Sequence, residues 1–129
     1  MRRRLTLIVV GCLVALCTFT SVGAFTLADN SSGSSSLVGK KNTIQRAWAT
    51  ATTTVSGGQT SWQLGVTSTL SGSGGNSASK TTSSGSISVD SPAGFCIGSP
   101  CGLTFTSFHT WDGEWNGHKH YQNSNTKNI

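Results

Sequence analysis

The chain has 129 residues and a formal net charge of +5, and only 10% of its residues are charged. This length suits one domain rather than two. Residues 2–4 are arginines, and without them the charge balance is 6 − 4 = +2. The remaining charges are scattered, with no basic stripe interleaved with aromatic side chains, so the composition argues against nucleic-acid binding.

Residues 1–24 are typical of a cleaved signal peptide. The arginines precede an apolar run over residues 5–19, and small side chains at 22–24 favour cleavage after Ala24, with cleavage after Ala28 as the alternative. An apolar run of 15 residues is shorter than the roughly 20 that a membrane-spanning helix needs. We therefore expect a secreted, extracellular protein whose mature form has no stable membrane span.

The four cysteines fall into two pairs. Cys12 and Cys17 lie in the predicted signal peptide. A lipid-anchored Cys12 is a rival interpretation, but apolar residues continue over 13–16, where a lipoprotein normally has a polar tether. Cys96 and Cys101 remain in the exported part, and an even count in an oxidising compartment predicts one structural disulfide.

Composition divides the exported part into three segments. Residues 25–42 are rich in Ser and Gly without apolar periodicity, which predicts a flexible leader. Residues 43–122 are expected to form a single β domain, because Thr and Val favour strands and helix formers are scarce. Residues 123–129 form a polar tail that we expect to fray.

Alternation of apolar and polar residues indicates the strands. Residues 47–55 alternate loosely, and 61–70 alternate clearly. Residues 71–79 are of low complexity and are expected to form a mobile loop, and 86–90 return to alternation. In the clearest strand, the side chains expected in the core are Trp62, Leu64, Val66 and Leu70. If the first two strands pair as a hairpin, Trp48 and Trp62 can pack together.

Two further hairpins are expected toward the C-terminus. The first covers residues 95–108, with its loop at 97–100 and the cysteines at its neck. The second covers 109–121, where Asn116-Gly117 is typical of a two-residue turn. Together the elements predict an all-β protein, a small antiparallel β-sandwich or open barrel of about six strands.

The C-terminal segment contains the candidate site. With a two-residue turn at 116–117, Trp115 lies opposite His118 and Gly113 lies opposite His120, and opposed residues share a face. The predicted binding strip therefore consists of Trp111, Trp115, His118 and His120. Such a strip could stack on sugar rings or lie at a membrane interface. The alternative is that the tryptophans belong to the core.

The same register places the carboxylates on the other face. Asp112 and Glu114 are then separated from the histidine pair, so no metal site is predicted, since closed sites need four ligands. No cofactor motif is present, and the motif Gly-x-Ser-x-Gly does not occur. We therefore expect a protein without enzymatic activity.

These features favour a small secreted effector. In size and in its content of Ser, Gly, Trp and His, the chain is similar to small exported bacteriocins with a β-sandwich fold, although no motif aligns with them. We expect a bacteriocin-like effector that acts on a cell envelope. The alternatives are a module that binds a cell surface or a glycan, and a structural extracellular protein. An envelope component or glycan is the expected partner.

Overall fold

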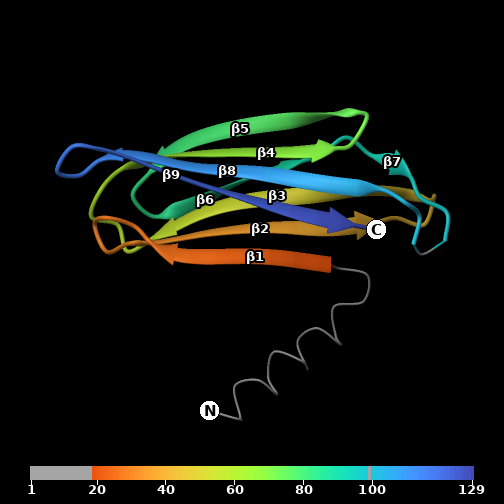
Figure 1. Cartoon of the computed structure of the whole chain (residues 1–129), viewed down its shortest axis with the longest axis horizontal. Helices are drawn as coiled ribbons and strands as arrows, with labels where there is room; N and C mark the ends of the chain where they lie inside the picture. The colour runs from red at the N-terminus through yellow and green to blue at the C-terminus, as the bar shows by residue number, and fades with distance from the viewer. Residues whose placement is uncertain (1–18, 99) are drawn as a thin grey trace, which may run out of the picture.

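The computed structural model describes residues 19–98 and 100–129. Most of the predicted signal peptide, residues 1–18, and residue 99 lie outside the described residues. The described part is an all-β sandwich of two antiparallel sheets (Figure 1), which confirms the predicted class. It contains nine strands rather than about six, because the end of the predicted signal peptide, the predicted leader and the expected loop at 71–79 each contribute a strand.

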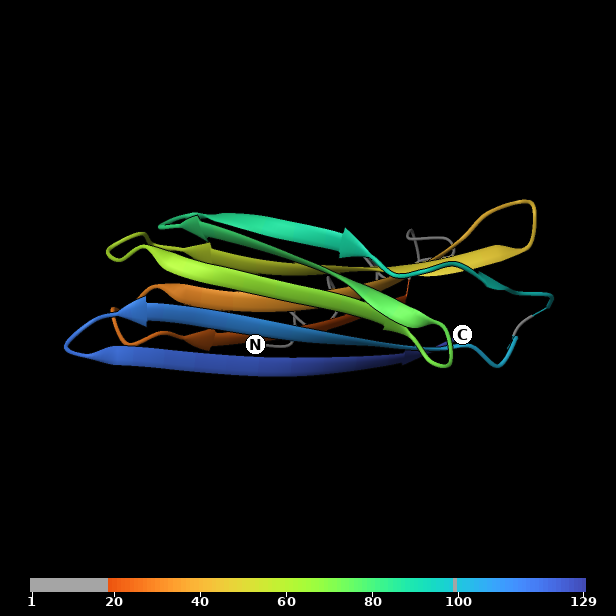
Figure 2. The same cartoon turned by 90° about the horizontal axis from the view of Figure 1, so that it is seen from above.

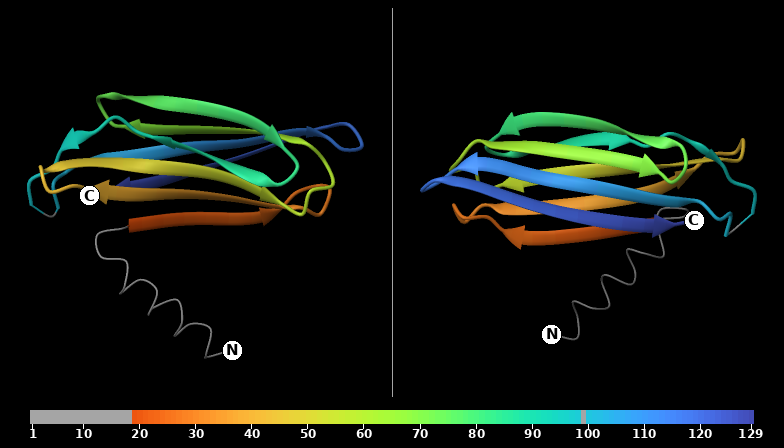
Figure 3. Two further views of the ribbon diagram at one scale, coloured as in Figure 1. Left: turned by 180° about the vertical axis from the view of Figure 1, so that it is seen from behind. Right: turned by 45° about the horizontal axis from the view of Figure 1, so that its top comes forward.

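Sheet A has the order β1-β2-β3-β6, with β7 also paired to β3, and sheet B has the order β5-β4-β8-β9. The strands are β1 (Phe19–Thr26), β2 (Ser32–Lys41), β3 (Arg46–Ser56), β4 (Trp62–Leu70), β5 (Gly74–Thr82), β6 (Gly85–Asp90), β7 (Gly94–Phe95), β8 (Thr104–Glu114) and β9 (His118–Asn128). Figure 3 shows sheet A from behind and, on the right, sheet B turned toward the viewer. All pairs are antiparallel.

Most of the predicted leader, residues 25–42, forms strands. Its second half is β2, which pairs with β3 over ten residues. The core side of β2 includes Ser35 and Leu37, both buried. A serine can face this core because Asn123 and Asn125 of β9 donate hydrogen bonds to its hydroxyl, at 2.6 and 3.2 Å. The polar composition of residues 32–41 therefore gave no indication that they form a strand with a buried side.

Two more segments differ from the predictions. The expected loop at 71–79 is mostly β5, which pairs with β4 through backbone hydrogen bonds although its side chains are small and mostly exposed. The expected tail at 123–129 completes β9, and the Ile129 amide donates to the Leu103 carbonyl. Both segments have few apolar side chains, and both are held in their sheet by backbone hydrogen bonds.

The expected hairpin at 95–108 is also wrong, although its disulfide is confirmed. Cys96 and Cys101 are bonded, but β7 pairs with β3 of sheet A, whereas β8 belongs to sheet B. The segment is thus a crossover between the sheets. Trp48 and Trp62 do not form a hairpin pair either, because β3 and β4 lie in different sheets and only Trp62 is in the core.

β1 includes part of the predicted signal peptide. Ala24, the predicted cleavage position, pairs with Ser34 in the middle of the β1–β2 ladder. Phe25 packs its ring against Trp111 and Tyr121, with centroids 4.8 and 5.7 Å apart. Cleavage after Ala24 remains a prediction, and it would remove residues 19–24 of this strand.

The interior contains two apolar clusters separated along the strands by a polar layer. One cluster lies toward the disulfide, and it includes Leu37, Ala49, Leu70 and Phe105. The other surrounds Trp62 and Trp111 near the opposite end. Between them, each of four strands contributes a buried polar residue, namely Ser35, Thr53, Ser68 or His109.

Asp29, which lies in the predicted leader, is also buried. Its carboxylate is fully buried, and it accepts hydrogen bonds from the Ser31 hydroxyl and amide and from the Trp62 indole. Burial by itself would raise the pKa of Asp29, but the bonds from Ser31 and Trp62 outweigh it and lower the pKa. Asp29 therefore anchors the turn between β1 and β2 to the core.

Candidate functional site

The β8–β9 turn fixes the position of the candidate residues. The loop has three residues, 115–117, with positive φ at Asn116 and Gly117 and a hydrogen bond from the Trp115 amide to the Gly117 carbonyl. The predicted two-residue turn is therefore wrong by one residue. The observed register pairs Glu114 with His118. Because side chains alternate between faces, this shift moves both histidines to the other face of the hairpin.

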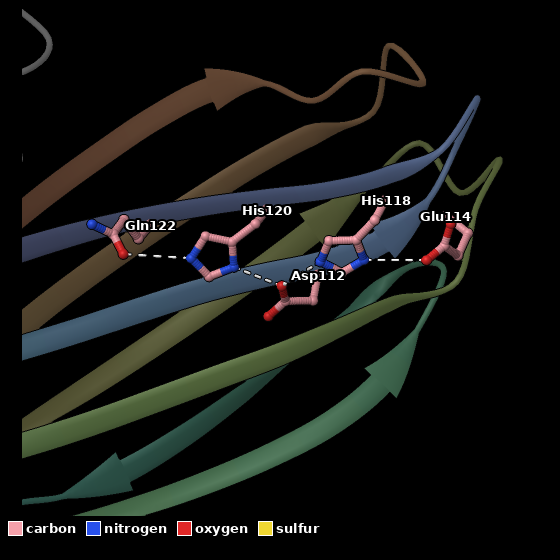
Figure 4. A network of polar contacts seen from close by, with 5 residues as sticks. All are labelled: Asp112, Glu114, His118, His120 and Gln122. Carbon is pink, nitrogen blue, oxygen red and sulfur yellow. Dashed lines mark hydrogen bonds and ion pairs between the residues drawn. The ribbon is translucent and has the colours of Figure 1, made fainter.

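The observed register places on one face the histidines and carboxylates that were predicted to lie on opposite faces of the hairpin. Asp112 lies opposite His120 and accepts a hydrogen bond from its Nδ1 at 2.6 Å. His118 Nε2 lies 3.5 Å from the same Asp112 oxygen, and its Nδ1 lies 3.2 Å from Glu114. Gln122 extends the network from His120 Nε2, as Figure 4 shows. We call these five residues the histidine–carboxylate network.

The network is exposed. The side chains of His118 and His120 are 62% and 46% accessible. The hydrogen bond to Asp112 raises the pKa of His120 above its ordinary 6.5, and Gln122 adds to this effect. The network offers hydrogen-bond donors and acceptors whose directions are already fixed by one another.

The predicted tryptophans lie elsewhere. Trp111 is fully buried, and its indole donates to the Thr54 carbonyl at 3.1 Å. Trp115 is half-buried in the turn itself. Of the predicted strip, only His118 and His120 share an exposed surface, and Trp111 belongs to the core as the alternative interpretation expected.

Phe108, which was not among the predicted site residues, also contributes to this surface. Phe108 is 42% exposed in the middle of β8, on the side of the strand that points away from the core. Its cross-strand neighbours are Thr67 of β4 and Ser124 of β9. Alternation could have found it, because Phe105 and Trp111 are buried at odd positions and Phe108 lies at an even one.

We call the solvent-facing side of sheet B its outer face. It is lined mostly by hydroxyl and amide side chains around Phe108, and the histidine–carboxylate network lies at the end near the 115–117 turn. Residues at the outward positions of the two central strands are Gln63, Gly65, Thr67 and Thr69 of β4 and Thr104, Thr106, Phe108, Thr110, Asp112 and Glu114 of β8. The face therefore combines one aromatic ring with many short polar groups.

The third histidine, His109, is buried in the polar layer. Its Nδ1 is 2.7 Å from the Thr53 hydroxyl, and its Nε2 is 2.8 Å from the Ser107 hydroxyl and 3.3 Å from the Asn125 amide nitrogen. The Asn125 nitrogen can only donate, so Nε2 accepts and Nδ1 carries the proton. The Thr53 hydroxyl therefore accepts from Nδ1, and it donates its own hydrogen bond to the Gly65 carbonyl at 2.9 Å.

In this arrangement both nitrogens of a neutral His109 ring have hydrogen-bond partners. No side-chain nitrogen or oxygen that is buried in the described residues lacks a hydrogen-bond partner. A positive ring at His109 would lie in the core without a facing carboxylate, and burial accordingly lowers its pKa from 6.5 to about 4. His109 is therefore a structural residue, although it lies beside a serine hydroxyl.

Comparisons with known proteins return nothing that this chain resembles: no family model, no curated protein and no solved structure matches it. Within residues 19–98 and 100–129, no three His, Cys, Asp or Glu side chains are arranged to hold a metal ion. The described residues also contain no helix of the length and apolarity needed to cross a membrane.

Proposed function

We propose that the protein is an exported, non-enzymatic module that binds an envelope glycan through the outer face of sheet B. The observation that carries the proposal is the position of Phe108. A large ring is 42% exposed at the centre of a sheet face, with threonine and serine as its cross-strand neighbours. Aromatic rings stack on the apolar faces of sugars, and the surrounding hydroxyls and amides bond to sugar hydroxyls.

The histidine–carboxylate network supplies the polar end of this site. Phe108 and Asp112 are four residues apart on one strand, which places them about 13 Å apart at about 3.4 Å per residue. Between them the outward positions hold Thr110 and, on β4, Gly65. The Thr110 side chain lies over Gly65, so a hydroxyl is presented between the ring and the carboxylate, and an extended oligosaccharide along β8 could bond to it.

The internal contacts of the network favour binding. Asp112 holds the His120 ring, and the His120 ring contacts Gln122. A ligand hydroxyl would therefore meet groups that are already oriented, which reduces the conformational entropy lost on binding.

The buried position of His109 supports a role without catalysis. Ser107 and His109 are hydrogen-bonded like a nucleophile and its base, but they are 3% and 0% exposed. A substrate cannot reach a hydroxyl that is enclosed between two sheets, and the ring is needed to satisfy Thr53.

The test is sedimentation of the purified protein with insoluble peptidoglycan, chitin and cellulose, and with intact bacterial cells whose survival is scored. We expect at least one glycan to retain the protein, and Phe108→Ser to weaken retention about tenfold, as for a central aromatic anchor. Asp112→Asn should weaken it severalfold. Phe95→Ser, which removes an exposed ring at a distant position, is the matched control and should bind the isolated glycans as the unaltered protein does.

The survival of the bacterial cells distinguishes between the two roles that this site could serve. Binding with loss of viable cells favours the bacteriocin-like effector, and binding without it favours an adhesive module. If no glycan or cell retains the protein, or if Phe108→Ser binds equally well, the proposal is wrong, and a structural extracellular role becomes the better hypothesis. Circular dichroism must show that each variant is folded.

A further inference from the structure

The end of the sandwich farthest from the 115–117 turn exposes three large apolar side chains. Ile44 in the β2–β3 loop is 72% exposed, and Phe95 and Ile97 near the disulfide are each 61% exposed. They are more exposed than Phe108, and all three lie on loops or at a strand end rather than on a sheet face. Figure 2 shows the β2–β3 loop and the segment after β7 at the same end of the molecule.

The two segments are fastened to one another. The Cys96 amide donates to the Gln45 carbonyl at 2.7 Å, and Phe95 pairs with Arg46 across the β3–β7 ladder. The side-chain oxygen of Asn42 accepts from the amides of Ile44 and Arg46 at 3.2 and 2.9 Å, which braces the loop from within.

The disulfide closes the other segment. Cys96 and Cys101 join its two sides, and the Lys41 ammonium donates to the Gly98 carbonyl at 3.0 Å. Since both segments are tied down, the apolar side chains are held in solvent instead of folding back onto the core. We call residues 40–46 and 94–98 together the disulfide end.

The charge of the disulfide end is positive. Lys40, Lys41 and Arg46 flank the apolar residues, and Lys41 and Arg46 are exposed. Asp90 at the end of β6 is bonded to the Thr50 hydroxyl. At the opposite end, Asp112 and Glu114 lie beside the turn and contact His118.

We propose that the disulfide end docks on an anionic phospholipid bilayer. Exposed Ile and Phe side chains on braced loops can enter the boundary between headgroups and acyl chains, and cations beside them lie at the level of the phosphates. The arrangement requires no membrane-spanning element. It is independent of the proposed glycan site, which lies on a different surface, and the two sites can act together on one envelope.

The experiment is flotation of the purified protein with phosphatidylglycerol vesicles and with phosphatidylcholine vesicles. We expect binding to the anionic vesicles that falls as salt is raised, because headgroup attraction is screened, and much weaker binding to the zwitterionic vesicles. Phe95→Ser, Ile97→Ser and Ile44→Ser should each weaken binding severalfold. Arg46→Gln should weaken it about fivefold, as expected for one cation near an anionic surface.

Phe108→Ser is the matched control, because it removes an exposed ring from the outer face of sheet B and should leave vesicle binding unchanged. The two serine variants of phenylalanine thus serve as controls for each other in the glycan and vesicle experiments. Failure of one proposal is therefore distinguishable from failure of the other.

Three results would overturn the docking proposal. One is the absence of binding to phosphatidylglycerol vesicles, and another is equal binding by Ile44→Ser and Phe95→Ser when both are folded by circular dichroism. The third is a concentration-dependent dimer in sedimentation velocity that these variants abolish, since the apolar side chains would then be covered by a second copy.

Discussion

Two regions of one hairpin place the same residue type in opposite environments. His109 lies in the polar layer, bonded to hydroxyls and an amide, whereas His120 lies on the outer face of sheet B beside Asp112. Burial lowers the pKa of His109 to about 4, and the carboxylate raises the pKa of His120 above 6.5. Neighbours in the fold, and not proximity in the chain, therefore determine the environment of each histidine.

The largest expected effect comes from removing the buried ring. His109→Ala leaves Thr53, Ser107 and Asn125 without their shared partner and opens a cavity, so we expect a loss of about 3 to 4 kcal/mol in the free energy of unfolding. Urea denaturation measures it. His120→Ala, the matched variant on the surface, should change stability by no more than about 0.5 kcal/mol. Equal effects of the two variants would contradict the distinction.

Acid should destabilise the fold through His109. Because its folded-state pKa is lowered to about 4, the stabilisation is complete above pH 6.5 and is lost as the pH falls from 6.5 toward 4. At about 1.4 kcal/mol per pKa unit, the expected loss between pH 7 and pH 4.5 is about 2 to 3 kcal/mol. Denaturation at both pH values measures it.

The control for the acid effect is His109→Gln, which cannot become charged. The drop in stability between pH 7 and pH 4.5 should be much smaller in this variant. Asp29 also has a lowered pKa, but its stabilisation is lost only below its ordinary 3.8, so it does not contribute in this range. If His109→Gln shows the same loss of stability between pH 7 and pH 4.5, then His109 is not the cause of that loss.

Opening the disulfide should have an intermediate effect that leaves both histidines unchanged. The Cys96–Cys101 loop is short, and the loop-entropy relation predicts a loss of about 2 kcal/mol in the double variant Cys96→Ser/Cys101→Ser. Thermal denaturation measures the loss, and NMR titration reads both pKa values. A changed pKa at either ring would show that the disulfide end and the histidines are coupled.

The smallest effect concerns the surface histidine. In Asp112→Asn, the pKa of His120 should return toward 6.5, with the His109 ring still neutral at pH 5. Histidine proton shifts followed by NMR from pH 4 to 9 measure both rings in one sample. An unchanged His120 titration would mean that the hydrogen bond between Asp112 and His120 does not persist in solution.

The sequence predicted the strands with strong apolar alternation, and it failed where small polar residues form strands. Trp62, Leu64, Val66 and Leu70 were placed in the core correctly, since period-two alternation is a local property. β2 and β5 were missed because their stability comes from backbone pairing with β3 and β4. Both partners adjoin these strands in the chain, but short polar side chains show no apolar alternation, so the pattern did not indicate a strand.

The candidate site was also predicted only in part, because the β8–β9 register differs by one residue from the predicted register. The residues His118 and His120 were identified from the sequence, but their carboxylate partners were assigned to the other face. A turn of three residues instead of two reverses every face assignment that follows it. The exposed ring of Phe108 was missed since its segment was assigned to a different hairpin.

Apolar alternation and an even number of exported cysteines are enough to predict an antiparallel all-β protein with one disulfide, because neither requires knowing which strands pair. Which polar residues are buried, and which histidine faces water, depends on the pairing of the strands and on the packing of the two sheets. Burial and pKa depend on the side chains that the opposite sheet and neighbouring strands bring within hydrogen-bonding distance, and those side chains lie up to 90 positions away in the sequence, as Ser35 and Asn125 do.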